Sequence, residues 1–189
     1  LGKSTIVGDQ GGPFSYPGDY FSAEAPAKYK IKGSYGHPVP VVDGKTQFAG
    51  SEAKAIVLRK EFTEEKDLFS IDYTSAYSTP NLDKLIRTFV YDRQGEGSFT
   101  VSDEFTVDTP IRFETAITTQ ADWKVLDDTR LLLTSGTEQM IVNIEASGKV
   151  AFTSETIEVN APAYTRIGIA LKEQAAKGYI RLKMQAKQL

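Results

Sequence analysis

Apolar and polar side chains alternate along most of the chain after Ala53. Apolar residues at every second position indicate strands with one buried face, whereas a helix would need a period of 3.6. About ten or more such runs follow one another, and strongly twisted open sheets rarely exceed about 10 strands without splitting. The sequence therefore predicts an all-β fold, a multi-stranded antiparallel β-sandwich with little helix, whose strands include Phe69–Tyr73, Arg87–Tyr91, Phe99–Val101, Phe105–Val107, Ile111–Phe113, Leu131–Leu133, Val142–Ile144, Val150–Phe152, Ile157–Val159 and Ile167–Leu171.

Glycine-containing turns separate the runs. Four of them are expected to supply the positive φ of tight hairpins, namely Asp43-Gly44, Gln94–Gly97, Ser135-Gly136 and Ser147-Gly148. The single helix candidate, Lys172–Lys177, is expected to be a loop turn before a last strand, Tyr179–Met184.

The first 50 residues differ from the rest because they are rich in Gly, Pro, Tyr and Phe. We expect an ordered loop there, whose aromatic side chains need a surface to pack on. A short strand, Thr5–Val7, is expected at its start. Because Leu1-Gly2-Lys3 is neither a signal peptide nor an initiator methionine, we expect residues 1–189 to form one β-sandwich domain of a longer chain.

The composition excludes several function classes. Lys and Arg number 22 against 25 for Asp and Glu, so a net charge of -3 predicts no nucleic-acid partner. The absence of cysteine excludes disulfides, thiolate metal sites and cysteine nucleophiles. No apolar run approaches the roughly 20 residues of a membrane-spanning helix, so no membrane partner is expected. No Gly-x-Ser-x-Gly motif supports a hydrolase triad.

Asp9 and His37 are the candidate metal ligands. Asp9 follows a short apolar run and Gly8, so its carboxylate is expected at a strand end, although it could equally cap a loop. His37 is the sole histidine and lies between Gly36 and Pro38, which favours a positioned side chain over a merely structural one. One oxygen and one nitrogen ligand suit zinc, yet a zinc site needs three or four protein ligands.

Cationic and aromatic side chains are candidates for contact with an acidic glycan. Arginines on strands could bind its carboxylates or sulfates, although a surface ion pair is the commoner role. Aromatic rings could stack on sugar rings, although most aromatics of a β-sandwich are core. The candidates are Arg59, Arg87, Arg93 and Arg112, with Tyr16, Tyr20, Tyr35, Tyr73, Tyr77 and Trp123.

Two segments, Ile6–Phe21 and Ser34–Gln47, resemble the heparinase II/III family of polysaccharide lyases in order and spacing. An Asp at a strand end precedes a Gly turn, and a Gly-His segment then runs into an Asp-Gly turn and a Gln. Ile71–Tyr77 and Arg87–Arg93 resemble strands of that family. The resemblance covers roughly residues 4 to 115.

The resemblance implies a longer protein in which an N-terminal α/α toroid precedes this domain. Such a protein would cleave uronic-acid-containing acidic polysaccharide, glycosaminoglycan-like or alginate-like, by β-elimination in the periplasm or outside the cell. Its acid and base would come from the toroid and an upstream His-rich strand, so no catalytic residue is expected here and the isolated domain would be inactive. Asp9 and His37 would correspond to structural zinc ligands.

A second hypothesis is a non-catalytic carbohydrate-binding or cell-surface β-sandwich. It accounts for the composition and the aromatic residues equally well. The two hypotheses differ in one observable: a lyase domain should carry a large exposed apolar patch where the toroid packs, whereas a binding module should hold glycan by itself. Fold class alone does not separate them.

Overall fold

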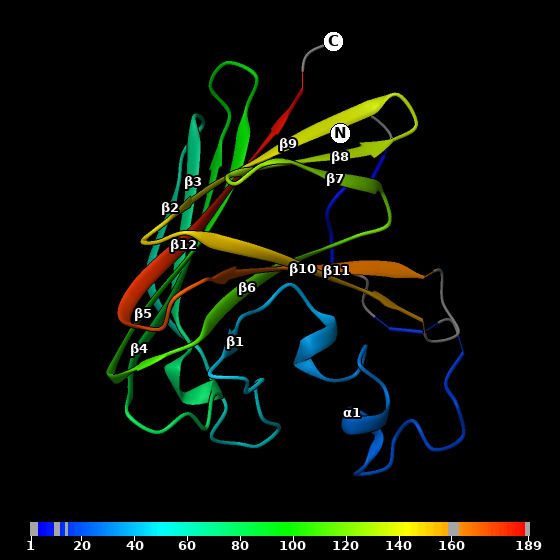
Figure 1. Ribbon diagram of the computed structural model, residues 1–189, viewed down its shortest axis with the longest axis vertical. Helices are drawn as coiled ribbons and strands as arrows, with labels where there is room; N and C mark the ends of the chain where they lie inside the picture. Colours follow the sequence, from blue (N-terminus) through cyan, green and yellow to red (C-terminus); the bar gives the residue numbers. More distant parts are fainter. Residues whose placement is uncertain (1–3, 10–11, 14, 159–162, 188–189) are drawn as a thin grey trace.

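The computed structural model describes residues 4–9, 12–13, 15–158 and 163–187 (Figure 1). Almost all of its regular structure is strand. The elements are α1 (Ala25–Lys28), β1 (Val41–Val42), β2 (Ile56–Phe62), β3 (Lys66–Asp72), β4 (Leu82–Asp92), β5 (Ser98–Ile111), β6 (Phe113–Thr119), β7 (Asp122–Asp127), β8 (Arg130–Ser135), β9 (Glu138–Ala146), β10 (Val150–Ile157), β11 (Tyr164–Leu171) and β12 (Ala175–Ala186), with single 3-10 turns at Ser34–Gly36 and Thr74–Ala76.

The strands form two antiparallel sheets. One has four strands in the order β1-β6-β11-β10, and the other has eight in the order β2-β3-β4-β5-β12-β9-β8-β7. Apolar side chains of both sheets meet in one core, where Ile117 and Ile167 of the smaller sheet lie with Leu131, Val142 and Leu182 of the larger. The prediction of an all-β antiparallel β-sandwich is confirmed.

The chain changes sheet at short connections. At Arg112 it passes from β5 to β6, so Ile111 and Phe113, predicted as one strand, belong to different sheets. The Phe113 ring stacks on Phe105 with centroids 4.3 Å apart, which places both rings in the core at this corner. The runs predicted around Phe99 and Phe105 join into the single long strand β5, because no turn residue separates them.

Three of the four predicted turns have the expected backbone. Asp43 and Gly44 have φ of 51° and 72°, and Gly95, Gly97 and Gly136 also have positive φ. Gly148 does not, because Ser147 to Lys149 is no hairpin: it carries the chain from β9 in one sheet to β10 in the other.

Three other predictions are corrected or fall outside the described residues. The expected loop turn is confirmed at residues 172–174, but β12 begins at Ala175 and not at the predicted Tyr179, and the one-turn helix α1 near the N-terminus was not predicted. Thr5–Val7 is no strand, although it lies beside the end of β6. Val159, Gln10 and Gly11 lie outside the described residues.

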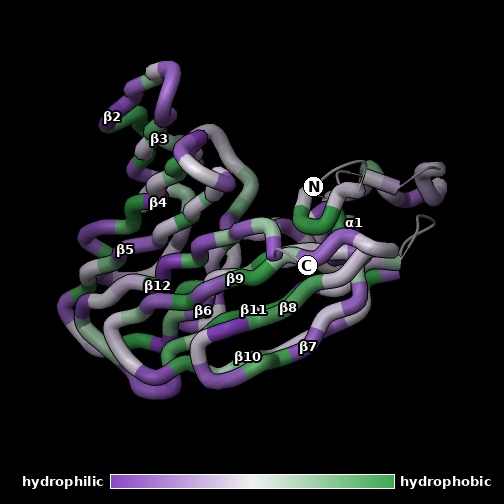
Figure 2. The backbone as a smooth tube through the Cα atoms, turned by 90° about the horizontal axis from the view of Figure 1, so that it is seen from above, coloured by the Kyte–Doolittle hydropathy of each residue, from purple (hydrophilic) through white to green (hydrophobic). Residues whose placement is uncertain are grey.

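The β2, β3 and β4 strands extend the larger sheet away from the smaller one, as Figure 2 shows. We call β2 to β5 the wing. All of β2 is exposed. Across the wing the rings of Phe69, Phe89 and Phe99 stack with centroids 6.4 and 6.2 Å apart.

Part of the N-terminal segment packs on the outer face of the smaller sheet. Tyr20 and Ile31 pack with Ile157 and Tyr164 in a second, smaller apolar cluster. The expectation that the aromatic residues of this segment need a surface is thus met at Tyr20, which is buried. Among the described residues, no helix is long and apolar enough to cross a membrane.

Candidate functional site

Asp9 and His37 come together at the outer edge of β6. One end of β6 pairs with β1. At the other end Gly8 N donates to Thr118 O at 3.2 Å, and the Thr119 hydroxyl donates to Ile6 O. The Thr119 hydroxyl thus takes the place of a backbone N–H donor in the strand ladder. This explains why Thr5–Val7 lies along β6 and yet does not form a strand.

The Asp9–His37 pair is a direct contact. Asp9 Oδ1 lies 2.7 Å from His37 Nδ1, and His37 Nε2 lies 3.0 Å from Ile31 O. Both oxygens are acceptors, so each ring nitrogen that carries a proton has a hydrogen-bond partner. The side chains are 54% and 26% exposed, so the pair can be reached from solvent. The structure thus brings together the two residues that the sequence analysis singled out, and their role as metal ligands stays a prediction.

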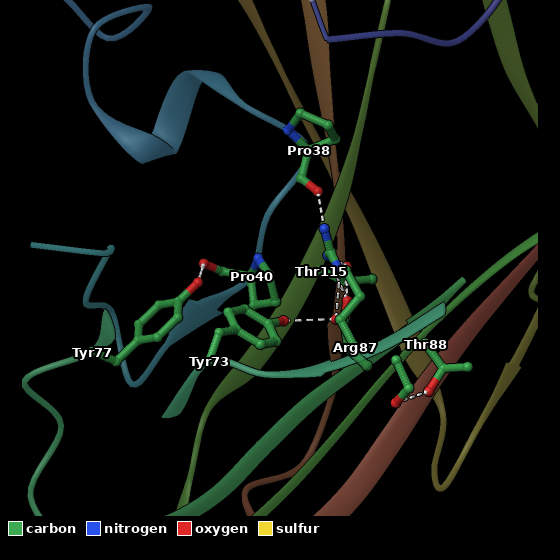
Figure 3. A network of polar contacts seen from close by, with 9 residues as sticks. Pro38, Pro40, Tyr73, Tyr77, Arg87, Thr88 and Thr115 are labelled. Atoms are coloured by element: carbon green, nitrogen blue, oxygen red, sulfur yellow. Dashed lines mark hydrogen bonds and ion pairs between the residues drawn. The ribbon is translucent and has the colours of Figure 1, made fainter. Parts of the chain in front are cut away.

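The segment that carries His37 is held by its carbonyl groups. Pro38 and Pro40 have no N–H, so the segment cannot pair as an ordinary strand. Instead, Tyr164 OH donates to Gly36 O at 2.9 Å, Arg87 Nη1 to Pro38 O at 2.6 Å and Tyr77 OH to Pro40 O at 2.8 Å. Three buried side chains, from β11, β4 and the residue after the 3-10 turn Thr74–Ala76, therefore fix alternate carbonyls on either side of His37, and two of these contacts are visible in Figure 3.

Arg87 is the centre of a buried polar network (Figure 3). Its Nε and Nη2 donate to the two oxygens of Asp103, both at 2.7 Å, and Tyr73 OH and Thr115 Oγ1 donate to the same carboxylate at 2.7 and 2.6 Å. Burial acts to lower the pKa of Arg87, but the attraction of Asp103 outweighs it and the pKa rises. Burial raises the pKa of Tyr73 well above its usual value, and the Asp103 charge adds to this.

The network corrects one expectation about the arginines. Arg87 is 6% exposed and satisfies Asp103, so it is no surface contact for a glycan. Arg59 and Arg93 form surface ion pairs with neighbouring carboxylates, the commoner role. Arg112 is exposed and has no ion pair among the described residues.

The predicted aromatic residues divide by burial. Tyr20, Tyr73 and Tyr77 are buried, and Trp123 packs against the core. Tyr35 covers the buried guanidinium of Arg166 at 4.3 Å from the ring centroid. Tyr16 is 58% exposed. The sequence analysis did not predict that Tyr77 and Tyr164 donate hydrogen bonds to this segment. The signal was Pro38 and Pro40, because a segment that cannot pair as a strand leaves carbonyl groups that need side-chain donors.

Asp9 and His37 fit only part of a zinc site. Within the described ranges, no group of three or more His, Cys, Asp or Glu side chains is placed to hold a metal ion. The pair supplies one oxygen and one nitrogen of the three or four protein ligands that zinc needs. A complete site would therefore require ligands beyond these two residues.

An apolar groove of about 520 Å³ lies beside Asp9. Val7 and Pro38 line one side, and Phe89, Phe99 and Met184 of the larger sheet line the other. Further apolar side chains of the wing are exposed, namely Ile56, Val57, Leu58, Phe62 and Tyr91. These exposed side chains add apolar surface of the kind that a domain buries when it packs against another domain.

Comparison with known proteins identifies the fold. No protein-family model matches the sequence, and curated proteins give no match. A solved structure of heparinase III with methylated lysines superposes with a TM-score of 0.73 at 13% identity, covering 98% of this chain and 28% of that one. A heparan sulfate lyase mutant from Pedobacter heparinus gives 0.71 at 15%, with 98% and 29% covered. This chain therefore has a heparinase III-like fold and corresponds to less than a third of the chains it resembles.

Proposed function

We propose that this chain is the β-sandwich part of a polysaccharide lyase that cleaves uronic-acid-containing acidic polysaccharide by β-elimination. The observation that carries the proposal is the likeness to heparinase III and to a heparan sulfate lyase over 98% of the chain. The exposed apolar wing supports it, since such a surface suits a domain that packs against an N-terminal α/α toroid in a longer protein.

The proposed reaction requires an acid and a base. A base removes the proton beside the uronate carboxylate, the glycosidic oxygen leaves with a proton from the acid, and the product sugar gains a double bond. The described residues offer the Asp9–His37 pair, but no partner set that would complete acid, base and carboxylate recognition. We therefore propose that this chain alone is inactive and that the longer protein acts in the periplasm or outside the cell, where such polymers occur.

The test measures the ultraviolet absorbance of unsaturated uronate products. This chain and a version extended upstream are each incubated with heparan sulfate, chondroitin sulfate and alginate. We expect product from the extended version only. If the extended version is folded and releases no product from any acidic glycan, the lyase proposal is wrong.

We also propose that Asp9 and His37 contribute two ligands to a structural zinc site completed elsewhere in the longer protein. Carboxylate and imidazole are zinc ligands, and the pair ties the N-terminal segment to the loop before β1. Metal analysis of the extended protein should find zinc that is lost in His37→Gln and kept in Asp19→Asn, a matched surface carboxylate. Equal zinc content in both variants would contradict this assignment.

A further inference from the structure

Beside α1 lies a cluster of aromatic rings that the proposed lyase reaction does not use. Tyr16, Tyr20 and Phe21 have ring centroids 5.0 to 5.4 Å from one another, and Tyr29 lies 5.5 Å from Tyr20. We call these four residues the aromatic shelf. Figure 1 shows α1 on the side of the molecule near β10 and β11.

The shelf has a buried base and an exposed surface. Tyr20 is 6% exposed and packs with Ile31, Ile157 and Tyr164, which anchors the cluster to the smaller sheet. Phe21 is 74% exposed and Tyr16 is 58% exposed. The outer faces of these two rings are in contact with water and add no buried apolar area to the fold. These faces are therefore available to a ligand.

One lysine gives the shelf an uncompensated positive charge. The Lys32 ammonium lies 5.0 Å from the Tyr20 ring centroid and 5.4 Å from that of Phe21. Its hydrogen-bond acceptor is Tyr20 O, and within the described part of the chain no carboxylate pairs with it. Lys28, by contrast, is neutralised by Asp19. An anion that reached the shelf would therefore meet Lys32 with donors to spare.

The shelf is connected to the Asp9–His37 pair. Ile31, which packs against Tyr20, accepts the hydrogen bond of His37 Nε2. Tyr164 packs in the same cluster, and its pKa is raised to about 12, first by burial and then by the nearby Asp9 and Tyr20. The pair and the shelf thus belong to one continuous surface layer over the smaller sheet.

We propose that the aromatic shelf is a binding subsite for an acidic sugar residue. A pyranose ring has a face of C–H groups that packs on aromatic carbon, here on Phe21 and Tyr16. Its carboxylate or sulfate would pair with Lys32, which supplies the charge-assisted hydrogen bond. The identity of the sugar rests on the proposed function, whereas the shelf itself is a site of this chain.

The experiment titrates this chain calorimetrically with a size-defined heparan sulfate oligosaccharide and with an uncharged cello-oligosaccharide. Phe21→Ala and Tyr16→Ala should each weaken heparan sulfate binding about tenfold. Lys32→Gln should weaken binding of the acidic oligosaccharide and reduce its dependence on salt, because one ion pair is lost. The matched controls are Phe62→Ala and Lys60→Gln on β2, which should bind like the parent chain.

Two results would contradict the proposal that the aromatic shelf binds an acidic sugar. One is that the folded chain binds no acidic oligosaccharide; the other is that the shelf variants bind as the parent does or lose no more affinity than the β2 controls. Circular dichroism of each variant establishes that it is folded. The shelf is tested by binding affinity and the lyase reaction by product formation, so each proposal can fail without the other. Shelf-dependent binding with no product from the extended protein would indicate that the chain is a binding module.

Discussion

Removal of the Arg87 guanidinium should destabilise the protein strongly. In Arg87→Met, Asp103 stays 1% exposed and loses its cation, while Tyr73 and Thr115 still donate to it. Breaking one side of a buried ion pair costs about 3–5 kcal/mol. The Pro38 carbonyl loses its donor as well, at about 1–3 kcal/mol if it stays dry. We therefore expect a loss of at least about 4 kcal/mol, a large fraction of the 5–15 kcal/mol typical of a domain.

Urea unfolding followed by the fluorescence of Trp123, the sole tryptophan, measures this loss. The control is Arg59→Met, whose ion pair is exposed and screened by solvent, so that its loss should leave the unfolding curve nearly unchanged. The double variant Arg87→Met with Asp103→Leu removes both charges and should recover part of the loss, because no unpaired carboxylate remains; the recovery is only partial, because Tyr73 and Thr115 lose their acceptor. A loss below about 1 kcal/mol in Arg87→Met, or no recovery in the double variant, would refute the reasoning.

Two further predictions concern the segment that carries His37. A Cβ at Gly36 would lie 2.3 Å from the backbone oxygen of Lys30, so Gly36→Ala should lower the free energy of unfolding by about 1–3 kcal/mol, whereas Gly18→Ala, with no atom within 4 Å, should stay within about 0.5 kcal/mol in the same urea assay. Because the pKa of Tyr164 is raised from 10.0 to about 12, the folded state holds this proton more tightly than the unfolded chain, and the stability that this contributes is present below pH 10.0 and lost as pH rises toward about 12. Unfolding midpoints across that range should fall less steeply in Tyr164→Phe, and parallel curves for the two proteins would contradict the assignment.

The sequence was sufficient for the fold class because strand periodicity is local. Alternation on β9 and β12 follows from one buried face, and the Asp43-Gly44 turn follows from backbone chemistry that only a few residues tolerate. Separating the sheets was harder, because the apolar alternation runs through Ile111 and Phe113 unchanged and Pro110 alone marks a break near Arg112.

The candidate site was predictable in part. The proximity of Asp9 and His37 followed from family resemblance, since 28 positions separate them in sequence. The burial of Arg87 was not predictable, because its partner Asp103 lies on the adjacent strand in a register that sequence alone does not specify. Arg93, one residue past the end of the same strand, lies at the surface and pairs with Asp67.

The position of β12 has a consequence for the order in which the larger sheet can assemble. β12 lies between β5 and β9, so it joins two meanders, β2 to β5 and β7 to β9, that share no other strand pairing. Both meanders leave the ribosome before β12 does, each with a row of unpaired backbone N–H and C=O groups at the edge that β12 later covers. Until the final strand arrives, those edges are open to pairing with other chains, and aggregation during synthesis is the competing outcome. Deletion of the chain from Ala175 onward should therefore separate the larger sheet into its two meanders, and not merely remove one edge strand.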